Sequence, residues 1–142
     1  MYLVLQVLAT AQALEKAGQQ LFRPHGLTVA RFNVLNLLSD QPEGVRASNL
    51  ARALVVDPSN ITGLLKRMKA EGLLTELANA HDRRQHVVAL SAKGRKAWQA
   101  AHRDYERRLE AFESALSMAE RKAVEKVLQR MLAESATLPE TR

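Results

Sequence analysis

Short polar side chains and cations alternate with apolar residues between Asp57 and Gly72 (DPSNITGLLKRMKAEG). At about 100° per residue in a helix, the polar and basic side chains would point away from the apolar ones. Short donors and acceptors can read base edges in a major groove, and cations can bind the neighbouring phosphates. The outward face and its flanks comprise Ser59, Asn60, Thr62, Gly63, Lys66, Arg67, Lys69 and Ala70.

Signals for the start and the end of a helix bound this stretch. Asp57 can accept hydrogen bonds from free backbone N–H groups, and Pro58 suits the first helical position. Gly72 tolerates the left-handed conformation in which many helices end. The spacing i, i+3, i+4, i+7 predicts a buried face formed by Ile61, Leu64, Leu65 and Met68.

Gly63 stands in the middle of this predicted helix, where glycine costs about 1 kcal/mol relative to alanine. Close approach of the backbone to a duplex would explain the missing side chain. We therefore interpret the stretch as a DNA-recognition helix. A solvated helix face with an incidental glycine is the alternative.

Two helices are expected before it. Thr28 can cap the first, which continues to about Leu38 and is followed by a loop at residues 39–44. Val45 and Arg46 can form a very short strand, and Ser48 is the expected cap of the second helix. Two short helices joined by a tight turn are typical of a helix-turn-helix. The residues expected to point inward are Ala30, Val34, Leu35, Leu38, Leu50, Ala51 and Leu54, and Val55 and Val56 form the turn.

After Gly72 the periodicity changes to that of a β-hairpin. Residues 73–77 and 86–90 are the expected strands, and residues 78–84 (ANAHDRR) form the tip. In an extended segment Asp82 and Arg84 project to the same side, so the carboxylate can orient the guanidinium. Arginines presented on a hairpin suit a narrow minor groove. An ordinary charged hairpin tip, with Arg83 and Arg84 solvated, is the alternative.

Long amphipathic helices are expected at both ends of the chain. Residues 1–26 contain one, Ser91 begins another, and Ser117 with Glu120 forms a capping box that opens the last, before Pro139. We expect the first helix to pack partly on the chain and partly on a second copy. The apolar face of the first helix comprises Leu3, Val4, Val7, Leu8, Ala11, Leu14, Gly18, Leu21 and Phe22. That of the helix beginning at Ser91 comprises Trp98, Ala101, Tyr105, Leu109 and Phe112, and that of the last helix comprises Ala123, Val124, Val127, Leu128 and Met131.

Composition is typical of one mainly helical globular domain of 142 residues. The net charge is +6, and residues 43–97 hold ten Lys and Arg against five Asp and Glu, which favours a polyanionic partner. The absence of cysteine excludes disulfides, thiolate metal sites and thiol redox sensing. The N-terminus lacks the basic start of a signal peptide, and no apolar run reaches about 18 residues, so we expect no membrane partner. A cytoplasmic location is compatible with this composition.

Several consecutive segments resemble the MarR family of winged helix-turn-helix transcription regulators over nearly the whole chain. They are SNLARAL at 48–54, DPSNITGLLKRMKAEGLL at 57–74, DRR at 82–84 and ALSAKGRK at 89–96. The resemblance implies a mainly α fold with a β-hairpin wing. In this fold residues 28–90 form the DNA-binding part, and residues 1–26 and 91–138 form dimerisation helices of a single domain.

The resemblance further implies a homodimer on an inverted-repeat operator, with recognition helices in successive major grooves and wings in flanking minor grooves. Arg84 would occupy the minor-groove position with Asp82 as its support. Lys66 and Lys69 stand where many members carry acidic residues, and Gly63 replaces a longer side chain. The expected DNA-binding residues are Ser48, Ser59, Asn60, Thr62, Gly63, Lys66, Arg67, Arg83 and Arg84.

Many relatives release DNA when a small aromatic compound binds between the dimer helices and the winged part. His25, Trp98 and Tyr105 are conceivable lining residues of such a pocket, although buried aromatic residues are more often core. The sequence does not assign the pocket. A small-molecule effector is therefore a prediction of the resemblance alone.

Other classes of function remain open. An enzyme is disfavoured because the histidines are scattered and neither a catalytic triad order nor a Gly-rich phosphate loop is present. His81 and His86 could meet as metal ligands, but solvated histidines are favoured, so we expect no metal and no cofactor. A sequence-tolerant architectural DNA-binding protein and a helical protein-interaction domain are the alternatives. We favour a regulator, and a repressor over an activator.

Overall fold

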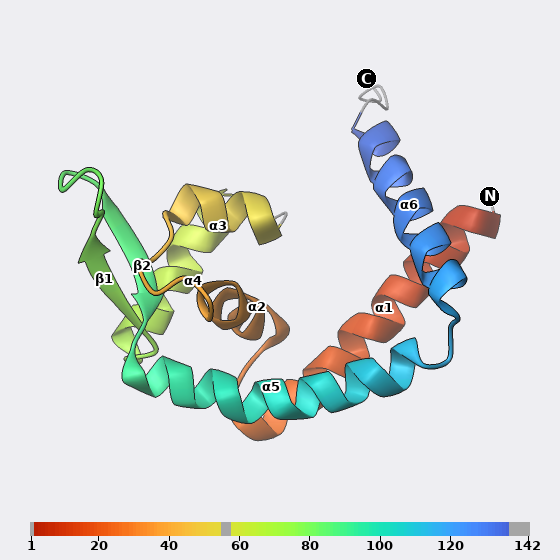
Figure 1. Ribbon diagram of the computed structural model, residues 1–142, viewed down its shortest axis with the longest axis horizontal. Coiled ribbons are helices and arrows are strands. Elements are labelled where there is room, and N and C mark those ends of the chain that lie inside the picture. Colours follow the sequence, from red (N-terminus) through yellow and green to blue (C-terminus); the bar gives the residue numbers. More distant parts are fainter. Residues whose placement is uncertain (1, 55–57, 137–142) are drawn as a thin grey trace. The chain divides into compact units, whose positions relative to one another are not determined.

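The computed structural model describes residues 2–54 and 58–136. Helices dominate it, with one two-stranded antiparallel sheet (Figure 1). The elements in chain order are α1 (Tyr2–Phe22), the short 3₁₀ helix η1 (Arg23–His25), α2 (Val29–Leu38), α3 (Ala47–Leu54), α4 (Pro58–Ala70), β1 (Leu74–Ala78), β2 (His86–Leu90), α5 (Ala92–Glu113) and α6 (Met118–Ser135). The predicted mainly α winged helix-turn-helix fold is confirmed.

Two compact units make up the chain, Met1–Tyr105 and Glu106–Arg142, and each is described by itself. The single-domain assignment and the dimerisation role of the terminal helices stay predictions. No helix in the described ranges is long and apolar enough to cross a bilayer.

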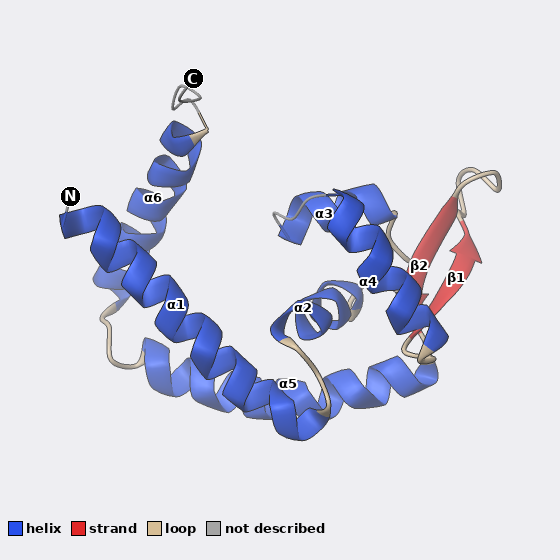
Figure 2. Cartoon of the chain, turned by 180° about the vertical axis from the view of Figure 1, so that it is seen from behind, coloured by secondary structure: helices blue, strands red, loops and turns tan. Residues whose placement is uncertain are grey.

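The core of the first unit is built around α2. Phe32, Val34, Leu35 and Leu38 are almost inaccessible to solvent, and α2 contacts α1, α3 and β2. Figure 2 shows α3 and α4 side by side, with the hairpin next to α4. The apolar sides of all these elements meet in one cluster, so a helix-turn-helix and a wing share a single core.

The predicted caps are mostly confirmed. The Thr28 hydroxyl accepts a hydrogen bond from the Arg31 N–H at the start of α2. Ser117 and Glu120 form both bonds of the capping box that opens α6, and the Ser117 hydroxyl, then its N–H, lowers the pKa of Glu120. Gly72 adopts a left-handed conformation after α4, with φ of 77°. The proposed cap Asp57, the turn at Val55 and Val56 and the terminal Pro139 lie outside the described residues.

Two local predictions in the helix-turn-helix region were wrong. Ser48 is not the cap of α3, because the helix begins at Ala47 and the Arg46 carbonyl already accepts from the N–H groups of Asn49 and Leu50. Ala30 is exposed rather than inward, because it lies in the first turn of α2 beside an open groove, and Phe32 fills the core instead.

The predicted apolar face of α6 is not buried within the described chain. The elements described in the second unit are the end of α5 and α6, which are too few to enclose these side chains by themselves. Much of α1 is similarly open, whereas Leu21 and Phe22 at its end are buried. The large exposed apolar residues in the described ranges are Tyr2, Leu3, Val4, Leu5, Leu8 and Leu14 in α1, Leu77 in β1, Phe112 in α5, and Met118, Val124, Val127, Leu128 and Leu132 in α6.

The root of the wing is joined to the start of α5 by a compact set of hydrogen bonds. The Ser91 hydroxyl donates to the Gly72 carbonyl and accepts from the Gly94 N–H, so Ser91 caps α5 at the start that the sequence predicts for this helix. The Ser91 N–H donates to the Leu73 carbonyl at 3.2 Å. Gly94 lies so close to Leu73 that a Cβ atom there would overlap its carbonyl oxygen.

We predict that Gly94→Ala lowers the free energy of unfolding by about 2–3 kcal/mol, because the backbone of α5 must move away from Leu73. Denaturant unfolding at fixed protein concentration measures this change. Gly63→Ala is the matched control, since the added Cβ would meet only the Arg67 side chain, at 3.5 Å. Stability of Gly94→Ala equal to that of the wild type would show that close packing at the wing root is not required.

Candidate nucleic-acid interface

The polar face of α4 is directed away from the core as the sequence predicts. Ser59, Asn60, Thr62, Lys66 and Arg67 are exposed, and Gly63 is half-buried. On the opposite face Ile61, Leu65 and Met68 are buried and Leu64 is partly buried. Burial of these apolar side chains fixes the rotation of α4 about its axis, and so determines which residues a ligand can reach.

The C-terminal end of α4 is held by charged side chains from distant parts of the chain. Arg31 of α2 binds both carboxylate oxygens of Glu71, with N–O distances of 2.7 and 2.5 Å. The Lys93 ammonium donates to the Glu71 carbonyl at 2.7 Å. A cation beside the last carbonyl groups suits the partial negative charge at a helix C-terminus.

The two lysines of α4 differ in their electrostatic surroundings. Lys69 forms a 3.2 Å ion pair with Glu76 of β1, and His86 lies 3.7 Å from the same carboxylate. Lys66 is exposed and forms no ion pair with any described residue. The basic charge that α4 offers to a ligand therefore comes mainly from Lys66 and Arg67.

The wing is a hairpin with the predicted strands and a tip stabilised by side-chain turns. Leu74 pairs with Leu90 and Ala78 with His86 at the two ends of the ladder. In the tip, the Asn79 side chain accepts from the His81 N–H at 2.9 Å, and the Asp82 carboxylate accepts from the Arg84 N–H at 3.0 Å. Such turns are typical of Asn and Asp.

Asp82 supports Arg84 differently from the prediction. The expectation was contact with the guanidinium, but the carboxylate binds the backbone N–H, because a tight turn brings the main chain of Arg84 back toward residue 82. Arg83 and Arg84 are both exposed, and no ion pair within the described ranges neutralises them. The wing therefore presents two cations to solvent.

One contact at this face was missed by sequence reasoning. Arg46 donates from Nη1 to the Gln85 side-chain oxygen at 2.7 Å, which joins the start of α3 to the wing. Beside it, Val45 forms an antiparallel bridge with Val88, so the predicted short strand is a single paired residue. Arg46 and Gln85 lie 39 residues apart in the sequence, and no periodicity of the sequence predicts the hydrogen bond between them. Ser48 is exposed in the first turn of the same helix.

The histidines and aromatic residues considered as ligand groups have separate surroundings. In the described ranges no group of three His, Cys, Asp or Glu side chains could hold a metal ion. His25 binds Asp104 at 2.8 Å, the Trp98 N–H donates to Asn36, and the Tyr105 ring packs against Phe22 and Phe32. These contacts hold α5 against the core of the first unit.

Comparison with known proteins agrees with this geometry. The MarR family model matches residues 25–85, which contain α2, α3, α4 and the hairpin tip. Over these residues the chain is similar to the MarR family. A transcriptional activatory protein, BadR from Rhodopseudomonas palustris, is 34% identical over 91 residues, which are 63% of this chain and 52% of BadR. This chain spans about half the length of the two curated relatives to which it is 34% identical, over 91 and 89 aligned residues.

Other similar proteins match over a longer stretch. The homoprotocatechuate degradative operon repressor of Escherichia coli is 26% identical over 130 residues, which are 89% of this chain and 86% of the repressor. A crystal structure of the M. tuberculosis transcriptional regulator MOSR in complex with DNA is 27% identical, with a TM-score of 0.73 and coverage of 95% and 98% of the two chains. The named relatives of this chain are transcription regulators, not enzymes.

We predict that Gly63→Ala stabilises the protein by up to about 1 kcal/mol and weakens DNA binding by about tenfold or more. The first effect follows from helix propensity, since the chain leaves room for a Cβ atom. The second follows if the bare backbone lies against the duplex. Denaturant unfolding and fluorescence anisotropy with labelled DNA measure the two effects. Unchanged affinity in a stabilised variant would show that the glycine is incidental.

Proposed function

We propose that this chain is a MarR-family, sequence-specific DNA-binding transcription regulator. The observation that carries the proposal is the pairing of α4 and the wing within one compact unit. Exposed short polar side chains and Lys66 lie on α4, and Arg83 and Arg84 lie on the hairpin tip without an ion pair to any described residue. A helix face of this kind fits a major groove, and the arginines fit the minor groove beside it.

The contacts can be divided by chemistry. Ser59, Asn60 and Thr62 are short enough to reach base edges or backbone near the start of α4, and Gly63 permits close approach. Lys66 and Arg67 carry cations suited to phosphate, as does Arg83 on the wing. Arg84 would enter the minor groove, with its backbone held by Asp82. Ser48, in the first turn of α3, would bind a phosphate through its hydroxyl.

A homodimer is part of the proposal. The exposed apolar faces of α1 and α6 are too extensive for an isolated soluble chain, since Leu3, Leu8 and Leu132 are each more than half exposed. A second copy of the chain would cover them. Two-fold symmetry then requires an inverted-repeat operator, with half-sites about one helical turn apart.

Repression is the proposed direction of regulation. The E. coli relative that matches most of this chain is named a repressor, whereas BadR is named an activatory protein. The direction of regulation therefore varies among similar proteins.

Selection of bound genomic fragments tests the proposed function. The purified protein is incubated with fragmented genomic DNA at about 150 mM salt with a non-specific competitor, because purely electrostatic binding is weakened there. We expect an inverted repeat. Binding without a shared motif would indicate a sequence-tolerant architectural protein, and no binding would indicate a protein-interaction domain.

Arg84→Ala is expected to weaken binding to the selected DNA by about tenfold and to relax the preference at bases flanking the half-sites, because minor-groove contact is lost. Lys66→Ala is the comparison variant. It should weaken binding to all duplexes alike and reduce the slope of log affinity against log salt concentration by about one. Titrations over a salt series measure both. Affinity of Arg84→Ala equal to that of the wild type would remove the wing arginine from the proposal.

A groove beside α4 is the proposed site of a small-molecule effector. Its volume is about 460 Å³, and Asn60 and Arg67 contribute to it as well as to the DNA-binding face. A small aromatic carboxylate could bury its ring against the apolar walls and pair with the Arg67 guanidinium. Its binding would compete with DNA for the same side chains. The lining residues are Glu15, Val29, Ala30, Asn33, Leu54, Asn60, Ile61, Leu64 and Arg67.

Ala30→Trp tests this groove. Ala30 is exposed at its edge, so an indole there should fill the groove without disturbing the core. We expect homoprotocatechuate, an aromatic carboxylate, to release the selected DNA from the wild type, and the variant to bind DNA without being released. Anisotropy of labelled DNA follows the release. Release from both proteins alike would place the effector elsewhere, and release from neither would remove this effector from the proposal.

A further inference from the structure

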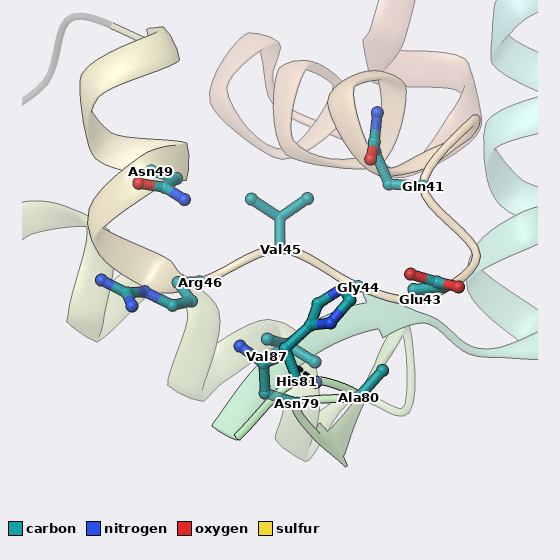
Figure 3. A pocket seen from close by; sticks show the side chains of 10 residues that line it. All are labelled: Gln41, Glu43, Gly44, Val45, Arg46, Asn49, Asn79, Ala80, His81 and Val87. Atoms are coloured by element: carbon teal, nitrogen blue, oxygen red, sulfur yellow. Dashed lines mark hydrogen bonds between the residues drawn. The ribbon is translucent and has the colours of Figure 1, made fainter. Parts of the chain in front are cut away.

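Packing alone does not fix the tip of the wing. Asn79, Ala80 and His81 line an open pocket of about 490 Å³, whose other wall is the loop before α3 and its first turn (Figure 3). Residues 80–86 are all exposed. The hydrogen bonds of the tip described above are internal to the hairpin, so they shape the tip without orienting it toward α3.

Two consecutive residues connect the hairpin to α3. Val45 exchanges both backbone hydrogen bonds with Val88, each 2.9 Å long, close to the root of the wing. Arg46 reaches farther out and donates to the Gln85 side chain at 2.7 Å. Its guanidinium is charged, so the bond is stronger than one between two neutral groups.

Gln85 is well placed to pass this restraint to the DNA-facing arginine. It follows Arg84 directly, its N–H donates to the Asp82 carbonyl at 3.0 Å, and its carbonyl accepts from the Asn79 N–H at 2.8 Å. The Arg84 N–H is held by the Asp82 carboxylate in the same turn. A restraint on the Gln85 side chain therefore acts on a turn that is rigid within itself.

We propose that Arg46 is a positioning residue for DNA recognition, which holds the wing tip to α3 through Gln85 so that Arg84 and α4 meet the duplex together. The inference rests on the proposed DNA-binding function. Without the bond, the tip must be ordered when DNA binds, and that ordering lowers affinity. The sequence preference should be lost mainly at the flanking base pairs that the wing contacts, and the preference for bases within the half-sites should persist.

A double-mutant cycle of Arg46→Ala and Gln85→Ala tests the proposal on a duplex of about 30 base pairs that carries the selected inverted repeat. Each single variant should bind about three- to tenfold more weakly, and the double variant no more weakly than the weaker single one. Gln85→Ala removes no charge, so its salt slope should equal that of the wild type. Additive losses, or wild-type affinity of Gln85→Ala, would overturn the positioning role.

Amide hydrogen exchange in the protein without DNA gives an independent measurement. The Arg84 and Gln85 N–H groups should exchange several-fold faster in both single variants, at unchanged global stability. Arg52→Ala is the control, because it removes an exposed cation from α3 without touching the wing. Unchanged exchange in Arg46→Ala and Gln85→Ala would overturn the restraint. No binding by the wild type would instead overturn the proposed function and leave exchange to decide whether Arg46 restrains the tip.

Discussion

The contact between Gly94 and the Leu73 carbonyl is the constraint on which the arrangement of α4, the wing and α5 depends. It lies where three elements meet, since Gly72 ends α4, Leu73 leads into β1 and Ser91 caps α5. A side chain at position 94 would separate them. Because the Ser91 hydroxyl also donates to the Gly72 carbonyl, it links the end of α4 to the start of α5 at the root of the wing. The ALSAKGRK segment thus has a structural role, because its Ser91 and Gly94 connect the start of α5 to the end of α4 and to the root of the wing.

Much of the fold could be predicted because its signals are local. The period of Ile61, Leu65 and Met68 gives the buried face of α4, and the changed period after Gly72 gives the hairpin. Thr28 and Ser117 mark helix starts by a mechanism confined to one turn. The errors came where tertiary contacts decide. Val45 pairs with Val88, so α3 begins directly after Arg46 and Ser48 loses its expected capping role.

The candidate site was predictable in composition but not in its connections. Residue types and helical geometry give the outward face of α4 and the arginines of the wing. The Arg46–Gln85 bond and the bidentate Arg31–Glu71 pair join residues about 40 positions apart, and their partners follow only from the folded arrangement. The role of Asp82 falls between these cases. The sequence indicates a supporting carboxylate, and the turn geometry directs it to the backbone of Arg84 rather than to its side chain.

The same arrangement determines how charge and selectivity are balanced. Lys66 and Lys69 both lie on α4, and two unpaired cations there would strengthen binding to any duplex through counterion release. Glu76 on the first strand of the wing pairs with Lys69 and partly offsets its charge, whereas Lys66 has no ion pair with any described residue and would be the more available of the two to phosphate. Under the proposed function, selectivity would then depend on the short polar side chains of α4 and on where the wing arginines lie relative to them. The close packing at Gly94 and the bond from Arg46 connect the wing to its neighbours at its root and near its tip, so under the proposed function the placement of the wing, as well as its charge, would limit which sequences fit.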